Sequence, residues 1–462
     1  MIVDRVFTPG LAQVAYFVAD EAAGEVAVID PRRDVEAYVA WAVARGLRIV
    51  AILETHIHAD FVSGCLELAA ATGAPIYTSR IGEQIFNRRP LDHGDEIAIG
   101  ALKLRAVWTP GHTPEHLCYL LIDPELGPVP IAIFTGDTLF VGEVGRPDLL
   151  GEMQTRKLAE QLYYTVTDRL STLHDTVVVY PGHTAGSACG KKIGAAPHTS
   201  IGQERLSNYA FQARSAASFM RMVLTGMPNP PTYYPVLKRV NKAGAPLVET
   251  LPQGEAFTSA EFAIRQQTGA LVIDTRSPDT FGQGHIPEAV FAGLGSSFTT
   301  WMGWLAPYDH DLILVLDADD QFASARTELR RIGLDRVAGY LAGGMRAWSA
   351  TGRATATLPQ WSVHDLARHR ELGQDALRVL DVRTAEELDD GHIAGASHIF
   401  AGDILQGADP PIDATVPVAV ICGSGYRSSV VSSSLLARGH RNLVNIRGGM
   451  GAWNNASLPV TT

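Results

Sequence analysis

An internal repeat in the C-terminal part of the chain constrains its fold more than any other feature. The segment LVIDTRSPDTFGQGHIPEA, which contains Asp274, is matched by VLDVRTAEELDDGHIAGA, which contains Asp381, 107 residues later. Further along, LAGGMRAW, ending at Trp348, is matched by IRGGMGAW, ending at Trp453, 105 residues later. Segments that recur in the same order at a nearly constant offset predict two copies of one domain.

Each copy alternates short β-branched runs with amphipathic stretches, a pattern typical of a parallel α/β sheet. We place the first copy at residues 257–353 and the second at residues 360–462, with the break SATGRATATLP between them. A different domain precedes them at residues 1–230. The Pro- and Gly-rich stretch GMPNPPTYYP and the polar residues after it predict a linker at residues 231–256.

Composition and charge argue against several classes of protein. The net charge of -11, from 38 basic and 49 acidic residues, disfavours a nucleic-acid partner or an anionic membrane. No apolar run reaches the ~18 to 20 residues of a membrane span, and the start MIVDRVFTPG lacks a signal-peptide pattern. The 4 cysteines are too few and too scattered for a disulfide framework. We therefore expect a cytoplasmic location.

Candidate metal ligands lie in four short motifs of the N-terminal domain. These are THIHADF with His56, His58 and Asp60, TPGHTPEH with His112, TGDT with Asp137, and PGHT with His183. Each motif directly follows a strand-like run, such as RIVAILE before the first and IAIFTG before the third. Loops at one edge of packed sheets can hold ligands in a fixed geometry. A lone histidine is usually a core or surface residue, but these motifs together predict a metal site.

The motifs resemble those of the metallo-β-lactamase superfamily, whose fold is an αββα sandwich with its site at the loop edge. For a two-metal member the resemblance implies one metal on His56, His58, His112 and Asp137, and another on Asp60, His183, the shared Asp137 and a histidine at position 61. This chain has Phe61 there. Because an apolar ring replaces a nitrogen donor, a tightly held second metal and a two-metal activation of water are disfavoured.

The remaining donors suit a single metal ion. His56, His112 and Asp137 form a two-histidine, one-carboxylate set, which is typical of non-haem Fe(II) oxygenases and leaves coordination positions open for substrate and O₂. We expect one Fe(II) per chain. Zn(II) would instead take a tetrahedral set that includes His58, and the sequence leaves open whether His58 coordinates or only supports the site. Without a second metal, Asp60 and His183 are expected to orient ligands or substrate.

The chain also resembles the persulfide dioxygenases, iron members of this superfamily, and their fusions to rhodanese domains. GEVGRPDL, directly after the Asp137 strand, resembles the G-R-x-D element of that group, and HTAGSACG and TSIGQER resemble the fusion subgroup. The resemblance implies that Arg146 and Asp148 contribute to substrate binding, with Arg146 pairing either with the substrate or with Asp148. We interpret Cys189 in HTAGSACG as a packed thiol rather than a catalyst.

The thiol carrier of the persulfide stays open. The glutathione-persulfide enzymes have an aromatic residue shortly after the histidine that corresponds to His183, where this chain has Thr184 and Ala185. Persulfides of coenzyme A or cysteine are therefore equal alternatives to glutathione persulfide.

The second repeat contains a sulfur-transfer motif around Cys422. VAVICGSGYRS joins a strand to a Gly-containing loop and to the helical SVVSSSLLAR. Backbone N–H groups and the positive helix end would surround Cys422 and lower the pKa of its thiol, and Arg427 adds charge for an anionic substrate. With DVR and GGMGAW, the loop resembles rhodanese sulfurtransferases, whose nucleophile corresponds to Cys422. The first repeat has Asp317 and Phe322 at the equivalent positions, so we expect it to be inactive.

The preferred interpretation joins both sites in sulfide detoxification. The N-terminal domain would oxidise a thiol persulfide with O₂ and water to sulfite and thiol, and Cys422 would interconvert persulfide plus sulfite with thiosulfate plus thiol. We also expect a homo-oligomer. Two alternatives stay open: a glyoxalase-II-like zinc thioester hydrolase, against which Phe61 counts, and a non-catalytic persulfide-sensing scaffold. The open metal triad counts against the scaffold, because structural metal sites are closed.

Overall fold

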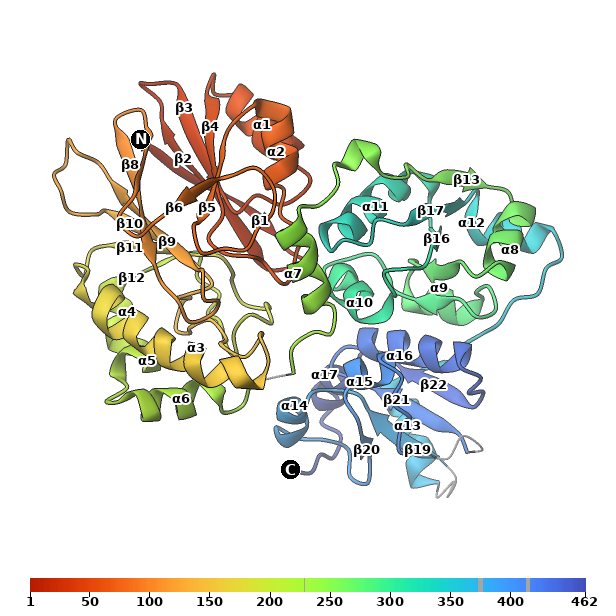
Figure 1. The fold of residues 1–462 in the computed structure, drawn as a ribbon. Coiled ribbons are helices and arrows are strands. Elements are labelled where there is room, and N and C mark those ends of the chain that lie inside the picture. The colour runs from red at the N-terminus through yellow and green to blue at the C-terminus, as the bar shows by residue number, and fades with distance from the viewer. Residues whose placement is uncertain (228, 373–376, 413–415) are drawn as a thin grey trace. The chain divides into compact units, whose positions relative to one another are not determined.

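The computed structural model describes residues 1–227, 229–372, 377–412 and 416–462. The chain divides into two compact units. The first comprises Met1–Thr250 with Arg330–Gly333, and the second comprises Leu251–Leu329 with Leu334–Thr462. Each unit is described by itself (Figure 1).

Two six-stranded sheets form the centre of the first unit. The first sheet has the order β1 (Ile2–Thr8), β2 (Gln13–Asp20), β3 (Glu25–Ile29), β4 (Arg48–Leu53), β5 (Ile76–Ser79), β6 (Arg89–Leu91). The second has the order β12 (Thr199–Ser200), β11 (Val178–Pro181), β10 (Ala132–Gly136), β9 (Leu117–Ile122), β8 (Leu102–Trp108), β7 (Glu96–Ile99). Both sheets mix antiparallel and parallel pairs, such as β1 with β2 and β10 with β11.

Helices cover the outer faces of both sheets (Figure 1). On the first sheet they are α1 (Glu36–Val43) and α2 (Cys65–Thr72). On the second they are α3 (Glu152–Tyr164), the π-helix η1 (Thr165–Arg169), the 3₁₀-helix η2 (Leu170–Thr172), α4 (Ile201–Ser207), α5 (Tyr209–Gln212) and α6 (Ala216–Leu224). The helix α7 (Tyr234–Ala243) and the 3₁₀-helix η3 (Val248–Thr250) follow in the chain. The residues 231–256 that we predicted as a linker therefore contain a helix, α7. Pro235 did not prevent it, because proline is tolerated in the first helical turn.

Successive side chains of a strand point to opposite faces of its sheet, and this alternation explains how the sheets and helices form layers. In β2, Tyr16 belongs to the core between the sheets, whereas Phe17 belongs to the core beneath α1, where it contacts Tyr38. In β9, Tyr119 faces the core between the sheets and Cys118 faces α3. Strands buried on both faces carry continuous apolar runs rather than alternating ones. The order helix, sheet, sheet, helix confirms the predicted αββα sandwich.

The second unit contains two parallel five-stranded sheets of the same topology. The orders are β13 (Glu255–Phe257), β17 (Val337–Leu341), β16 (Leu312–Val315), β14 (Leu271–Asp274), β15 (Val290–Phe291), and β18 (Gln360–Trp361), β22 (Leu443–Ile446), β21 (Val418–Ile421), β19 (Arg378–Asp381), β20 (Ser397–His398). Every pairing within them is parallel. The predicted duplication of a parallel α/β domain is confirmed.

The helices of the two repeats also correspond. The first repeat has α8 (Ser259–Gln267), α9 (Pro278–Gln283), α10 (Phe298–Leu305), η4 (Asp319–Gln321), α11 (Phe322–Arg331) and α12 (Gly344–Ala350). The second has α13 (Val363–Glu371), α14 (Ala385–Asp389), α15 (Ala401–Leu405), α16 (Tyr426–Ala437) and α17 (Gly449–Asn455). One hydrophobic cluster contains residues of both repeats, including Phe291 and Val431.

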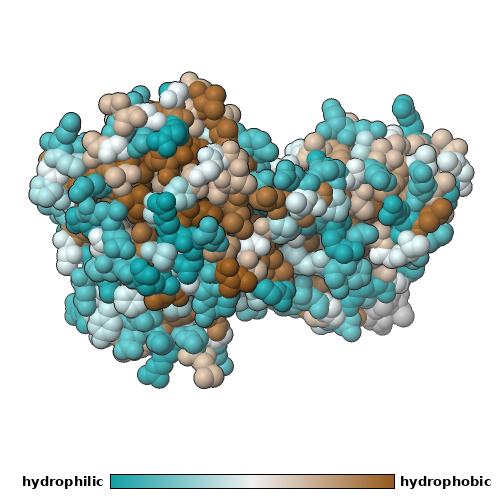
Figure 2. Space-filling model, turned by 45° about the horizontal axis from the view of Figure 1, so that its top comes forward, coloured by the Kyte–Doolittle hydropathy of each residue, from teal (hydrophilic) through white to brown (hydrophobic). Residues whose placement is uncertain are grey.

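The described surface mixes polar and apolar side chains. Figure 2 shows brown apolar residues among teal polar ones on the visible face. Exposed apolar side chains include Met153 at 96% and Ile85 at 77%. Within the four described ranges, no helix combines the length and the apolar character that crossing a bilayer requires.

Candidate metal centre and sulfur-transfer loop

The loops that follow β4, β8 and β10 bring three predicted ligands together. Donor atoms of His56, His112 and Asp137 all lie within 4.8 Å of one another, and the three residues are buried. Nε2 of His56 lies 3.8 Å from Oδ2 of Asp137, and Nε2 of His112 lies 3.6 Å from the same oxygen. These separations exceed hydrogen-bond length, so the three atoms surround a common point without bonding to one another.

The other nitrogen of each histidine is hydrogen-bonded, which fixes the tautomer. Nδ1 of His112 lies 2.8 Å from the carbonyl oxygen of Arg146, which can only accept, so Nδ1 donates. Nδ1 of His56 lies 2.9 Å from Oγ1 of Thr55, and that hydroxyl donates to Asp30 at 2.8 Å. Nδ1 of His56 must therefore donate as well. Both Nε2 atoms then present a lone pair toward Asp137.

These donors fit a metal ion. Nε2 of His56 and Oδ2 of Asp137 are buried and have no hydrogen-bond partner among the described residues. Burial lowers the pKa values of His56 and His112, which favours the neutral imidazole that a metal requires. An orphaned nitrogen and an orphaned carboxylate oxygen side by side would both be satisfied by one cation.

His58 lies beside these three residues, but its Nε2 faces two other carboxylates. Its Nε2 is 3.1 Å from Oδ1 of Asp30 and 3.6 Å from Oε2 of Glu54. Its Nδ1 is buried and unpartnered among the described residues. The geometry therefore permits both alternatives for His58, coordination through Nδ1 or support through its ring.

His183 connects two carboxylates. Its Nδ1 lies 2.8 Å from Oδ1 of Asp137, and its Nε2 lies 2.7 Å from Oδ2 of Asp60. Burial lowers the pKa of His183, but the two carboxylates outweigh it and raise that pKa well above its usual range. Phe61 is fully buried, and its ring centroid lies 4.3 Å from that of His58. His183 and the Phe61 ring thus lie on the side of the site where a second metal would be expected, and the donor atoms of Asp60, His183 and Cys189 lie there within 4.8 Å of one another.

Cys189 also lies in this region, which the sequence did not indicate. Its sulfur is within 4.8 Å of donor atoms of Asp60 and His183. Burial, with the charges of Asp137 and Asp60, raises the pKa of the Cys189 thiol well above its usual range, so the neutral thiol is favoured. The residue is buried, as we expected of a packed thiol. Its position on the same loop as His183 was the one available sequence signal.

Arg146 and Asp148 bind each other. Nε and Nη2 of Arg146 each lie 2.7 Å from a carboxylate oxygen of Asp148, and Nη1 donates to the carbonyl of Ala188 at 3.1 Å. Arg146 is fully buried. The sequence left open whether Arg146 pairs with the substrate or with Asp148, and the structure shows the pairing with Asp148. The backbone carbonyl of Arg146 accepts the hydrogen bond from Nδ1 of His112, one of the three candidate metal ligands.

Helix α7 holds the His56–Phe61 loop through Asn241. The Asn241 amide donates to the carbonyls of His58 and Phe61 at 2.8 and 2.7 Å, and its oxygen accepts from the backbone N–H of Ser63 at 2.9 Å. The sequence analysis missed this contact because it assigned the segment to a linker. The helical spacing of the buried residues Tyr234, Leu237 and Asn241 was the signal that could have found it.

In the second repeat, Cys422 occupies the loop between β21 and α16. The buried Sγ accepts hydrogen bonds from the backbone N–H of Gly425 at 3.1 Å and from Oγ of Ser428 at 3.4 Å. Gly425 caps α16 with φ +95°, which favours glycine. A side chain at Gly449 would lie 2.2 Å from the Cys422 carbonyl oxygen, so that glycine permits the loop to close.

Arg427 follows this loop and is paired with Glu387. Nη1 lies 2.6 Å from Oε2, and Nη2 contacts Oε1. Burial raises the pKa of Glu387, but Arg427 outweighs this effect and lowers it to about 2. The positive charge that we expected at the loop is therefore shared with a carboxylate.

Comparisons with known proteins agree with this geometry. A family model described as the metallo-beta-lactamase superfamily matches residues 8–183. A solved structure described as a metallo-beta-lactamase from Staphylococcus aureus subsp. aureus COL is 32% identical, with a TM-score of 0.66, and the match covers 74% of this chain and 98% of that one. The chain belongs to the metallo-β-lactamase superfamily.

The metallo-β-lactamase domain is followed by two matches to a model described as a rhodanese-like domain, at residues 258–351 and 362–456. A hydroxyacylglutathione hydrolase from Polaromonas sp. is 35% identical over 187 residues, or 40% of this chain and 66% of that protein. A persulfide dioxygenase, ETHE1, from Bos taurus is 29% identical over 185 residues, or 40% of this chain and 68% of that protein. The chain thus spans about two thirds of these curated relatives.

The rhodanese-like repeats differ at their loops. The prediction that Asp317 and Phe322 stand at the positions of Cys422 and Arg427 is wrong by one residue. Asp274 pairs with Val315 of β16, and its counterpart Asp381 pairs with Ile421 of β21, so Leu316 corresponds to Cys422. In the same register Gln321 corresponds to Arg427. The carboxylate of Asp319 accepts a hydrogen bond from the backbone N–H of Gly343 at 3.0 Å. The leucine side chain at the position of Cys422 cannot carry sulfane sulfur, which agrees with the expectation of an inactive copy.

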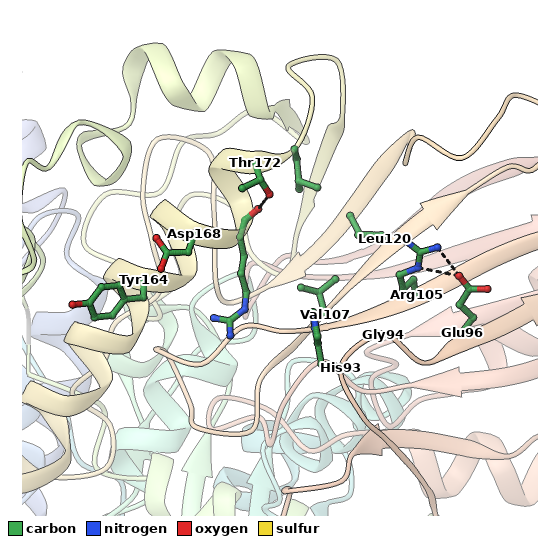
Figure 3. A pocket seen from close by; sticks show the side chains of 11 residues that line it. His93, Gly94, Glu96, Arg105, Val107, Leu120, Tyr164, Asp168 and Thr172 are labelled. Carbon is green, nitrogen blue, oxygen red and sulfur yellow. Dashed lines mark hydrogen bonds and ion pairs between the residues drawn. The ribbon is translucent and has the colours of Figure 1, made fainter.

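A surface pocket of about 870 Å³ in the metallo-β-lactamase domain is separate from these sites (Figure 3). It lies between strands β7 to β9 and the helical residues 164–173, and none of the candidate ligands lines it. Arg105 in its wall is paired with Glu96 at 2.7 Å. Its charged side chains are thus partly neutralised within the pocket.

Proposed function

We propose that the protein is a non-haem iron persulfide dioxygenase coupled to a rhodanese sulfurtransferase. The observation that carries this proposal is the convergence of His56, His112 and Asp137 on one point, beside a His183 whose two nitrogens are already bonded to carboxylates. The persulfide dioxygenase relative and the two rhodanese-like matches support it.

His56, His112 and Asp137 would hold the iron in a facial triad. When bound, Fe(II) supplies the one-electron chemistry that lets O₂ react with a closed-shell persulfide. The protein's own contribution is orientation. Thr55 and the Arg146 carbonyl fix the two imidazoles, and His183, held by Asp60, binds Oδ1 of Asp137, so that Oδ2 would be left to hold the metal.

The overall oxidation consumes one persulfide RSSH, one O₂ and one water, and it yields the thiol RSH and sulfurous acid, which ionises to sulfite. Cys422 would carry the second reaction. Its thiolate takes the terminal sulfur of a persulfide, which releases the thiol, and then passes this sulfur to sulfite as thiosulfate. The Gly425 N–H and the Ser428 hydroxyl would stabilise negative charge on the attacking sulfur.

Oxygen-electrode assays test the proposal. The purified chain is expected to consume one O₂ per persulfide and to form sulfite across a panel of glutathione, cysteine and coenzyme A persulfides. No O₂ uptake with any of them, while a glutathione thioester is hydrolysed, would instead support a zinc hydrolase. The hydrolase relative makes that the second candidate, although Phe61 removes a ligand that two-metal hydrolysis needs.

A further inference from the structure

Helix α7 turns one face toward the metal centre, and that face contains a lysine. Tyr234, Lys238 and Asn241 are spaced by four and three residues, so their side chains leave the same side of the helix. The hydroxyl of Tyr234 lies 4.0 Å from Sγ of Cys189, and Asn241 bonds the carbonyls of His58 and Phe61. Lys238, between them, therefore faces the same region.

The charges around Lys238 agree with this placement. Burial lowers the pKa of His112, and the positive charge of Lys238 acts in the same direction, so the ammonium is within electrostatic range of a candidate ligand. Burial lowers the pKa of Lys238, and the nearby carboxylate of Glu115 acts in the opposite direction. Lys238 is only partly exposed.

The ammonium of Lys238 has no ion-pair partner among the described residues. Glu115, whose charge acts on it, uses Oε1 to accept the backbone N–H of Ile57 at 3.0 Å. Glu115 offsets part of the cost of burying the Lys238 ammonium without forming a direct ion pair with it, and an anion from solution would lower that cost further. The active-site face of α7 therefore carries a positive charge to which no carboxylate of the described residues is directly paired.

We propose that Lys238 binds a carboxylate of the substrate, and that the preferred substrates are thiol persulfides with a carboxylate a few bonds from the sulfur. This inference rests on the proposed function and names the substrate class of the same site. The single ammonium group of Lys238 can form a charge-assisted hydrogen bond with one substrate carboxylate. The phosphates of coenzyme A lie at the end of a long pantetheine arm, so its persulfide would gain little from Lys238.

The test compares two thiols of equal chain length, 3-mercaptopropionate and 3-mercapto-1-propanol, and their persulfides. Isothermal titration of the metal-loaded full chain measures the dissociation constants of the thiols, and the oxygen electrode measures KM for the persulfides. The wild type is expected to bind the carboxylate thiol at least tenfold more tightly. Lys238→Met should remove this preference without weakening the neutral thiol more than twofold, and Lys238→Arg should retain it.

Equal binding of both thiols by the wild type, or equal weakening of both by Lys238→Met, would overturn the role of Lys238. Metal content measured on each variant separates loss of the anchor from loss of the site. The binding arm does not depend on turnover. If carboxylate binding depends on Lys238 but neither persulfide drives O₂ uptake, the anchor stands and the dioxygenase proposal fails.

Discussion

His183 and Phe61 lie where a second metal ion would bind, and Phe61 removes one donor from that position. His183 uses both nitrogens for carboxylates, and Phe61 places an apolar ring against His58. The sequence alone identified the missing donor at position 61. It could not show that His183 forms two hydrogen bonds, because its partners Asp137 and Asp60 lie 46 and 123 residues away in the chain.

Replacement of Phe61 by histidine tests this interpretation. Phe61→His restores a nitrogen donor near Asp60 and His183, so metal content measured after growth with zinc should rise from about one ion per chain toward two. Phe61→Leu keeps an apolar side chain and serves as the control. An unchanged metal content in the histidine variant would count against the missing-ligand argument.

Cys422 provides a test of separable chemistry. Cys422→Ser keeps a side chain of similar size that can accept from Gly425 and Ser428, but a hydroxyl cannot carry sulfane sulfur. Thiosulfate formation should be abolished, while O₂ uptake with a supplied persulfide stays within about twofold of wild type. Loss of both activities would contradict two independent sites.

The ion pair between Arg427 and Glu387 predicts a pH dependence of stability. Arg427 lowers the pKa of Glu387 from 4.5 to about 2, so the pair stabilises the folded state above pH 4.5, and this contribution is lost as the pH falls toward 2. Glu387→Gln should therefore lower the melting temperature of the rhodanese-like unit at pH 7 and lower it progressively less below pH 4.5. Calorimetry at several pH values measures this, and a pH-independent difference would argue that packing alone is responsible.

Among the elements, α7 was the main one that sequence patterns failed to predict. The strands that lead to His56, His112 and Asp137 were found because their β-branched runs end at the motifs, and the structure places all three ligands at those strand ends. The Pro- and Gly-rich stretch before α7 indicated a loop, although Pro235 occupies a helical turn that tolerates it. The loop propensity of proline and glycine describes the residues before α7. Tertiary contacts, such as those of Asn241, determine the helix that follows.

Asn241 allows the contribution of α7 to be measured. Asn241→Ala removes three hydrogen bonds and leaves the His58 and Phe61 carbonyls and the Ser63 N–H without that partner, which should cost about 1–3 kcal/mol of stability. The variant should also lose metal faster to a chelator. Arg239→Ala, on the exposed face of α7, is the matched control. Equal chelation rates in both variants would show that α7 does not hold the metal loop.

At the scale of the whole molecule, the duplication was predictable because its motifs keep register, and both sheets have the same strand order. The sequence predicts an inactive first copy because that copy lacks a cysteine at its loop, but it assigned the wrong residue to the position of Cys422. Strand pairing places Leu316 there instead of Asp317, because the offset between the repeats changes by one residue along the chain. The limits at residues 230, 257, 353 and 360 stay predictions. We propose that the fusion raises the local concentration of the persulfide or sulfite that both sites share.

The metal content of the purified full chain is the most direct test of the central claim, a single redox-active metal held by His56, His112 and Asp137. Elemental analysis by mass spectrometry, on protein prepared without added metal or chelator, should give one iron per chain. Alanine variants at the three ligands should each lose it. Two zinc ions per chain, with persistent binding in the Asp137→Ala variant, would contradict the account.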